Sequence, residues 1–122
     1  MKYYRLHIDS KNDSIIYRKI TKILAIEPAD FKEDKNNKDL NSLWTYSVEE
    51  KEEEPNYDFI NQFLDIIEPN LSELKKIGID REDITFWMIY EYDQQCSMEF
   101  HPQEMKRLGE SGIIMCIDCF QK

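Results

Sequence analysis

The chain has 122 residues, of which 41% are hydrophobic and 12% aromatic, and its formal net charge is −9. This length predicts a single domain, residues 1–122, and the apolar content is enough for one core, which argues against wholesale disorder. The negative charge argues against nucleic acid and anionic membranes as ligands, because both are bound through clusters of Lys and Arg. It favours fast association with a basic protein partner.

The N-terminal sequence and the cysteine content predict a cytoplasmic protein. Residues 1–9 lack the apolar core of about 7–15 residues that secretory signals carry, and no apolar run approaches the roughly 20 residues that span a bilayer. The chain has three cysteines, an odd number, and none lies in the first 95 residues. Since this is not the pattern of a disulfide framework, we expect a reducing compartment.

The N-terminal part is expected to form a strand, a helix and a second strand. Residues 3–8 alternate at the strand period, and residues 13–24 carry apolar side chains at helical spacing, with Asp13 as the N-cap. Residues 29–42 are rich in Asp and Asn and predict a solvated loop. Residues 43–48 form the second expected strand.

A long helical stripe is expected in the middle of the chain, over residues 59–77. Asn56 is the expected N-cap. Pro69 predicts a break near Glu68, because proline lacks an amide hydrogen and clashes with the preceding turn. Gly78 is the expected C-terminal cap residue.

The C-terminal part begins with the most convincing strand, residues 84–92, which is rich in aromatic and β-branched side chains. A short turn leads into residues 96–100, which predicts an antiparallel hairpin. Pro102 is expected to begin a helix whose buried side includes Met105 and Leu108. Residues 113–120 form the closing strand.

This order of elements predicts an α+β fold. We expect a single mixed, mainly antiparallel sheet of about five strands, covered on one face by two to three helices, in an α/β sandwich. The chain contains no convincing internal repeat.

Five short landmarks recur in a characteristic order: Leu-Ala-Ile-Glu-Pro at 24–28, Leu-Trp at 43–44, Ile-Glu-Pro at 67–69, His-Pro-Gln-Glu at 101–104 and Ile-Asp at 117–118. In order and spacing they resemble the bacterial domain of unknown function 4279 family, in which a helix ends in Leu-Gly-Ile-x-Pro, a Leu-Trp strand follows and the closing strand carries Ile-Asp. Ala25 stands where the family usually has glycine. The resemblance covers nearly the whole chain and implies a fold without an established activity.

The cysteines offer weak evidence for redox or metal chemistry. Cys116 and Cys119 have the spacing of a redox pair, but a strand directs them to opposite faces, and a redox pair normally needs a helix N-terminus. Cys96 and His101 complete a conceivable zinc set, but these residues are spread over two strands and a helix start instead of tight turns. We expect structural, unpaired cysteines, no metal and no cofactor.

Known catalytic motifs are absent from the sequence. There is no nucleophile elbow, phosphate-binding glycine loop or HExxH motif, and the chain has only two histidines and three glycines. Acid-base chemistry would fall to carboxylates, which are abundant on any acidic surface. We therefore assign no catalytic residue and predict that the protein is not an enzyme.

Two features form the candidate interaction surface, an acidic run and one tryptophan. Its members are Glu49, Glu50, Glu52, Glu53, Glu54 and Trp87. The acidic run suits a basic partner, and the alternative is a solvated loop. Trp44 is expected in the core, and Trp87 on the less covered side of the sheet, where an exposed ring would indicate binding.

Two functional hypotheses follow. The first is a non-enzymatic protein-interaction module, with an immunity protein that binds a basic bacterial toxin as its specific form. The second is a small-molecule binding module that uses an aromatic-lined face of the sheet. An unusual hydrolase is a third alternative, and the sequence leaves open whether the protein is a monomer or a homodimer.

Overall fold

The computed structural model describes residues 1–29, 42–53 and 57–122. Most of the predicted loop at 29–42, the expected cap Asn56 and Glu54 of the candidate surface lie outside these residues. The described residues include every strand and helix named below, so they define the sheet and the helices that cover it.

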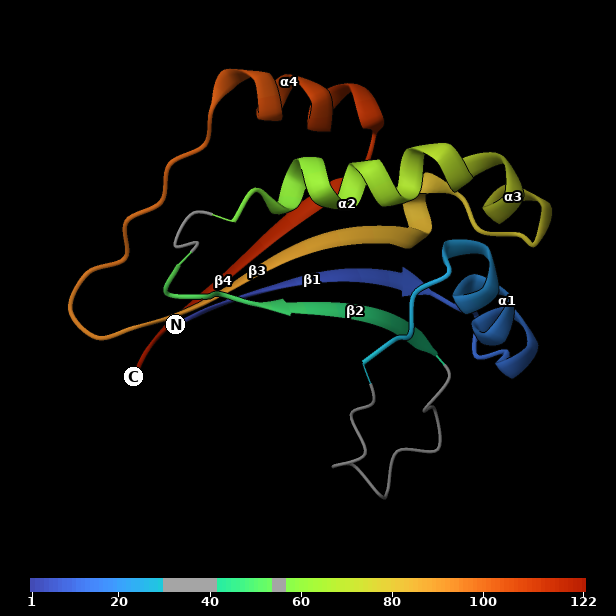
Figure 1. The fold of residues 1–122 in the computed structure, drawn as a ribbon, viewed down its shortest axis with the longest axis horizontal. Helices are drawn as coiled ribbons and strands as arrows, with labels where there is room; N and C mark the ends of the chain where they lie inside the picture. Colours follow the sequence, from blue (N-terminus) through green and yellow to red (C-terminus); the bar gives the residue numbers. More distant parts are fainter. Residues whose placement is uncertain (30–41, 54–56) are drawn as a thin grey trace.

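A mixed sheet forms the base of the molecule (Figure 1). Its strands, in spatial order, are β2 (Leu43–Glu49), β1 (Lys2–Asp9), β3 (Ile84–Tyr92) and β4 (Ile114–Gln121). β1 is antiparallel to both of its neighbours, whereas β4 is parallel to β3. A parallel pair needs a long connection, and here it contains a helix.

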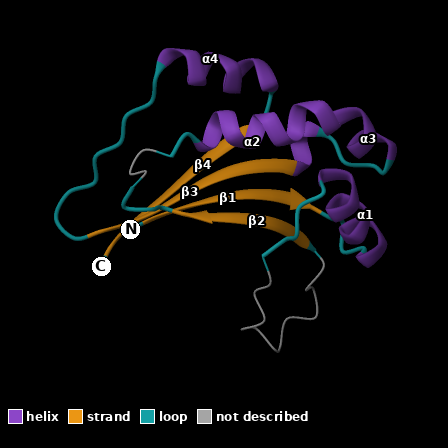
Figure 2. Cartoon of the chain, viewed as in Figure 1, coloured by secondary structure: helices purple, strands orange, loops and turns teal. Residues whose placement is uncertain are grey.

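Helices lie on one side of this sheet (Figure 2). They are α1 (Ser14–Leu24), α2 (Phe59–Ile67), α3 (Leu71–Lys76) and α4 (Pro102–Ser111), with short 3-10 turns η1 (Glu68–Asn70) and η2 (Arg81–Asp83). The α+β class and the single helix-covered face are therefore confirmed.

The long helix breaks where proline was expected to break it. α2 ends at Ile67, η1 contains Pro69, and α3 continues to Lys76. Gly78 follows with φ of +89°, a left-handed conformation that favours glycine. The expected cap is replaced by a neighbour, because the side chain of Asp58 accepts a hydrogen bond from Asn61 N at the start of α2.

The core lies between the sheet and α2. On β1 and β3 the side chains that face the helices alternate with those on the other face, and the buried set is Tyr4, Leu6, Ile8, Ile84, Phe86 and Met88. From α2, Phe63 meets Phe86 edge to face at 5.4 Å between ring centroids. Each such buried side chain stabilises the fold by about 1.5–3 kcal/mol.

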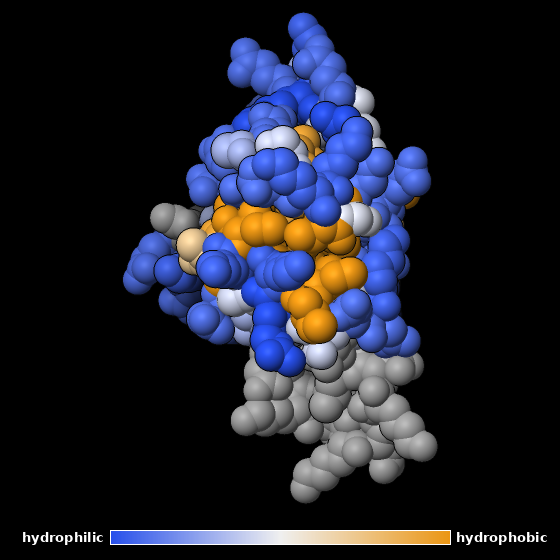
Figure 3. Space-filling view, turned by 90° about the vertical axis from the view of Figure 1, so that its right-hand side faces the viewer, coloured by the Kyte–Doolittle hydropathy of each residue, from blue (hydrophilic) through white to orange (hydrophobic). Residues whose placement is uncertain are grey.

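α1 and α3 close one end of the sandwich. The side chain of Asp13 caps α1, as expected, and Ile20 and Leu24 are buried beneath it. Trp44 of β2 is fully buried, and its Nε1–H donates to Thr21 Oγ1 of α1 at 3.0 Å, which confirms its expected place in the core. Seen from this end, hydrophobic side chains gather in the middle and hydrophilic ones surround them (Figure 3).

The predicted hairpin is wrong. Residues 96–100 form no strand, so the sheet has four strands among the described residues and not about five. The reason is that both edges of β3 are occupied, one by β1 and the other by β4. The segment from 93 to 101 instead leaves the sheet and leads to α4.

The expected burial of α4 is only partly confirmed. Leu108 is buried, but Met105 is 40% exposed. α4 packs beside α2 and is fixed there by Arg107, which donates to Asn61 Oδ1 and to Asp65 Oδ1, each at 2.8 Å. Because these are polar contacts between helices, the apolar stripe of α4 is buried only at Leu108.

Ala25 ends α1 in a left-handed conformation, with φ of +55°. A residue with a Cβ pays about 1–2 kcal/mol there, and glycine does not, although glycine also raises the entropy of the unfolded chain. We expect Ala25→Gly to raise the free energy of unfolding by about 0.5–1 kcal/mol, measured by urea denaturation. Ala29→Gly is the matched control, because Ala29 lacks a positive φ, and it should give no gain. An Ala25→Gly variant no more stable than the wild type would contradict this account.

Candidate ligand-binding cavity

A cavity of about 380 Å³ lies at the end of the sandwich opposite α1 and α3. Five segments line it: the start of β1, the residues that enter α2, Met88 of β3, residues 97–101 and Glu104 of α4. It opens here because the helical cover of the sheet begins only at Phe59, while residues 97–101 pass over the gap.

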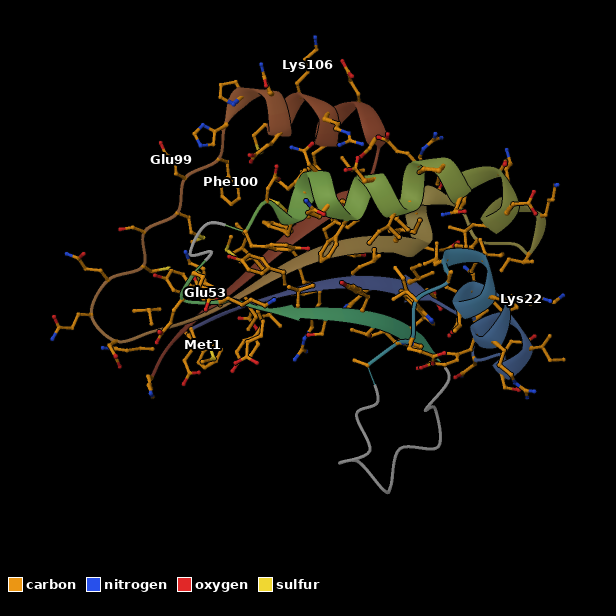
Figure 4. All side chains as sticks on the ribbon, in the orientation of Figure 1. Met1, Lys22, Glu53, Glu99, Phe100 and Lys106 are labelled. Carbon is orange, nitrogen blue, oxygen red and sulfur yellow. The ribbon has the colours of Figure 1, made fainter. Side chains whose placement is uncertain are left out.

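Aromatic rings form the inner wall. The Tyr4 ring stacks on Phe59 with centroids 5.1 Å apart and meets Tyr57 at 5.3 Å. Phe100 is directed inward, toward α2, whereas its neighbour Glu99 is directed away (Figure 4). The wall is therefore apolar and held by packing with the core.

A lysine lines the cavity, and a carboxylate engages it. Lys2 Nζ lies 3.8 Å from Glu50 Oε1 and 4.9 Å from the centre of the Tyr90 ring. The backbone N–H of Lys2 also donates to Glu50 Oε2 at 3.2 Å. Burial, and then the charge of Glu50, raises the pKa of Tyr4 to about 12, so its hydroxyl remains neutral in the wall.

Carboxylates outnumber cations around the cavity. Asp58 is already used, since its oxygens accept from the backbone N–H of Asn61 at 3.1 Å and from Asn61 Nδ2 at 2.6 Å. Glu104 is half-buried in the first turn of α4, and Glu99 is exposed. His101 also lines the cavity at the start of α4. With Lys2 engaged by Glu50, the surroundings favour positive charge.

The acidic run is divided by the fold. Glu49 ends β2, pairs in register with Tyr3 and shares the uncovered face of the sheet. Glu50 turns to Lys2, while Glu52 and Glu53 are exposed in the turn that follows. Glu53 lies at the same end of the molecule as Phe100 (Figure 4).

Trp87 lies on the uncovered face, as expected from strand alternation. It is half-buried, it stands opposite Arg5 in the register, and its ring is 5.6 Å from that of His7. Trp87 does not line the cavity. The structure thus separates the two parts of the candidate surface, Trp87 on one face and most of the acidic run at the end of the sandwich.

The signal for the cavity in the sequence is only indirect. Its apolar residues Met98 and Phe100 alternate with Ser97 and Glu99, a period that also occurs in strands. The alternation is real, since Met98 and Phe100 are half-buried and Ser97 and Glu99 are exposed, but it belongs to a connecting segment and not to a sheet. A loop that crosses a gap in the helical cover can show the same period as a strand.

The cysteines are brought together in a different pair from the one the spacing suggested. Cys96 Sγ and Cys119 Sγ lie 3.3 Å apart, and all three cysteines are free thiols. Cys116 is on the other face of the sheet, in register with Trp87. In the part of the chain that the structure describes, no group of three or more His, Cys, Asp or Glu is placed to hold a metal ion.

A comparison with known protein families identifies the family of this chain. The model of the family called Domain of unknown function (DUF4279) matches residues 3–120. The chain belongs to the DUF4279 family. No curated protein and no solved structure matches it. For this DUF4279 domain the family carries no established activity, so the geometry of the cavity carries the functional argument.

One further property of the DUF4279 domain concerns membranes. No helix within residues 1–29, 42–53 and 57–122 is both long and apolar enough to cross a bilayer.

The uncovered face contains a histidine with a strongly shifted pKa. Burial, and then the positive charge of Arg5, lowers the pKa of His7 from 6.5 to about 4. Between pH 4 and pH 6.5 the His7 side chain binds a proton in the unfolded chain but not in the folded protein. The contribution of His7 to the free energy of unfolding therefore falls as the pH drops below 6.5 and is constant above it.

When the pH is lowered from 7 to 5, we expect His7 to reduce the free energy of unfolding of the wild type by about 2 kcal/mol. The reduction is roughly 1.4 kcal/mol for each pH unit. His7→Gln should lack that part of the loss, as measured by urea denaturation at both pH values. The exposed His101 supplies the control, His101→Gln, which should keep the wild-type loss. An equal pH dependence in wild type and His7→Gln would contradict the burial of a neutral imidazole.

Proposed function

We propose that this domain is a non-enzymatic binding module whose cavity takes a small ligand with an apolar body and a cationic group. The observation that carries the proposal is the cavity of about 380 Å³, which combines an aromatic wall with an excess of carboxylates. This replaces the expected site on the sheet face around Trp87 with a site at the end of the sandwich.

The apolar body is supported by the size of the cavity and by the aromatic and methionine side chains in its lining, beside which charged and polar side chains also lie. Ligand cavities have volumes of about 300–1,000 Å³ and are lined mostly by apolar side chains with a few polar groups. Tyr4, Phe59 and Phe100 supply flat apolar surfaces, and Met88 and Met98 supply adaptable ones.

The cationic group is supported by electrostatics. The faces of aromatic rings attract cations within about 6 Å of the centroid, and Tyr4 is neutral near pH 7, as a tyrosine normally is, and stays so to higher pH because its pKa is raised to about 12. Glu104 is half-buried beside the cavity, and Lys2, the only lysine that lines it among the described residues, is engaged by Glu50. An anionic ligand would face these carboxylates and a chain of net charge −9.

A basic protein partner is the second candidate, supported by the exposure of Glu52 and Glu53 at the cavity end of the molecule. A lysine or arginine side chain of such a partner presents the same chemistry as the small ligand, an apolar stem with a cationic head. An immunity protein against a basic bacterial toxin is the specific form of this candidate.

The small-ligand proposal is tested with three probes of similar shape: phenethylamine, phenethyl alcohol and phenylacetate. Phenethylamine should raise the thermal midpoint progressively with the logarithm of its concentration above the dissociation constant, corresponding to about 1.4 kcal/mol at ten times that constant. The neutral and anionic probes should give smaller shifts. Phe100→Ala and Glu104→Gln should each reduce the amine shift.

Phe120→Ala is the matched control for that experiment, because Phe120 is an exposed phenylalanine that does not line the cavity. Its amine shift should equal that of the wild type. Equal shifts from all three probes would contradict the cationic preference, and an amine shift that survives Phe100→Ala would place binding elsewhere.

The protein-partner candidate is tested by affinity capture from a bacterial lysate at low and high salt. A basic protein should be retained at low salt and released at high salt, because exposed charges are screened within about 8 Å at physiological ionic strength. Glu52→Gln/Glu53→Gln should weaken retention. Glu27→Gln/Glu82→Gln has the same net charge but changes exposed carboxylates elsewhere, and it should retain the partner. If both double variants lost retention of the partner equally, net charge alone would explain the binding, and the Glu52 and Glu53 site would be contradicted.

A further inference from the structure

Two thiols that are 23 residues apart in the chain meet near the end of β4. Cys96 lies in the segment between β3 and α4, and Cys119 lies near the end of β4. Their Sγ atoms are 3.3 Å apart, and a disulfide bond requires about 2.05 Å. The remaining gap is small compared with the movement available to a side chain in a connecting segment.

We propose that Cys96 and Cys119 form a site of reversible oxidation, at which an intramolecular disulfide closes and opens by exchange with a small disulfide such as oxidised glutathione. The thiolate of one cysteine attacks a glutathione sulfur, which forms a mixed disulfide and releases one glutathione thiolate. The other protein thiolate then attacks the protein sulfur of that mixed disulfide, which forms the Cys96–Cys119 bond and releases the second glutathione. The two protein thiols lose two electrons and two protons, and oxidised glutathione becomes two reduced molecules.

The third cysteine, Cys116, is kept apart from this pair by the fold. Cys116 is only three residues from Cys119, but strand alternation places it on the uncovered face, in register with Trp87. Cys119 is exposed and Cys96 is half-buried, so a small oxidant reaches the pair. The fold therefore selects the pair that is 23 residues apart over the pair that is three residues apart.

The Cys96–Cys119 disulfide would affect the cavity through the segment that follows Cys96. This effect on ligand binding rests on the proposed function. Residues 97–101, which line the cavity, follow Cys96 immediately. The segment is joined to the end of β4 at its first residue, because Gln121 Nε2 donates to Asp93 O at 3.1 Å, and Lys122 N donates to O of Tyr92, the last residue of β3, at 2.8 Å. A covalent bond at Cys96 would fix the base of the cavity wall to β4 and restrict the orientations of Phe100.

The modification is tested on the full chain, incubated with oxidised glutathione at low protein concentration. Intact mass spectrometry should show the loss of two hydrogen atoms, alkylation should label Cys116 alone, and peptide mapping should recover a Cys96–Cys119 cross-link. Cys116→Ser should form the same bond and be reversed by dithiothreitol. Cys96→Ser should stop at a glutathione adduct. A cross-link that contains Cys116, or oxidation only between molecules, would overturn the proposal.

The consequence for the cavity is tested separately with phenethylamine and the Cys116→Ser variant, oxidised and reduced. A thermal shift that differs between the two states by a factor of two or more supports the coupling, and equal shifts overturn it. If no amine binds in either state, the proposed function fails, while the mass and mapping results still decide the disulfide.

Discussion

Burial of one face of the sheet is the constraint on which the rest of this structure depends. β1 lies between β2 and β3, and its alternate residues Tyr4, Leu6 and Ile8 are covered by helices. Because side chains alternate along a strand, a shift of one residue in the register would expose this whole set. The edge-to-face contact between Phe63 and Phe86 fixes α2 over the same strands. The positions of the cavity and of the uncovered face both follow from this register.

The cavity is the place where that cover ends. Tyr4 and Phe59 belong both to the core and to the cavity wall, so the site is continuous with the packed interior and shares its rigidity. The opposite wall, residues 97–101, is a connecting segment without regular structure. A rigid wall facing an adaptable one is the usual arrangement of binding sites, in which a packed scaffold positions a variable segment.

The charges of the chain serve different purposes in different places. Arg107 joins α4 to α2 through Asn61 and Asp65 and to η1 through Glu68, and the carboxylates of Asp65 and Glu68 hold its pKa above the usual range. Asp58 caps α2. Once these structural roles are removed, the carboxylates that remain near the cavity have no comparable cation among the described residues, and the proposed class of ligand rests on this imbalance. Net charge alone does not contain this information, because it counts structural and available carboxylates together.

The sequence by itself determined the elements whose signals are local: the strand periods of β1, β2 and β3, the Asp13 cap, the break at Pro69, the core position of Trp44 and the family landmarks. Tertiary structure decided what depends on residues far apart in the chain. The pairing of β4 with β3 left no edge for the hairpin expected at 96–100, and it brought Cys119 to Cys96. The cavity is formed by segments from residue 2 to residue 104, and its position depends on where the helical cover stops. Period and capping are properties of neighbouring residues, whereas occupancy of a strand edge and closure of a cavity are properties of the assembled chain.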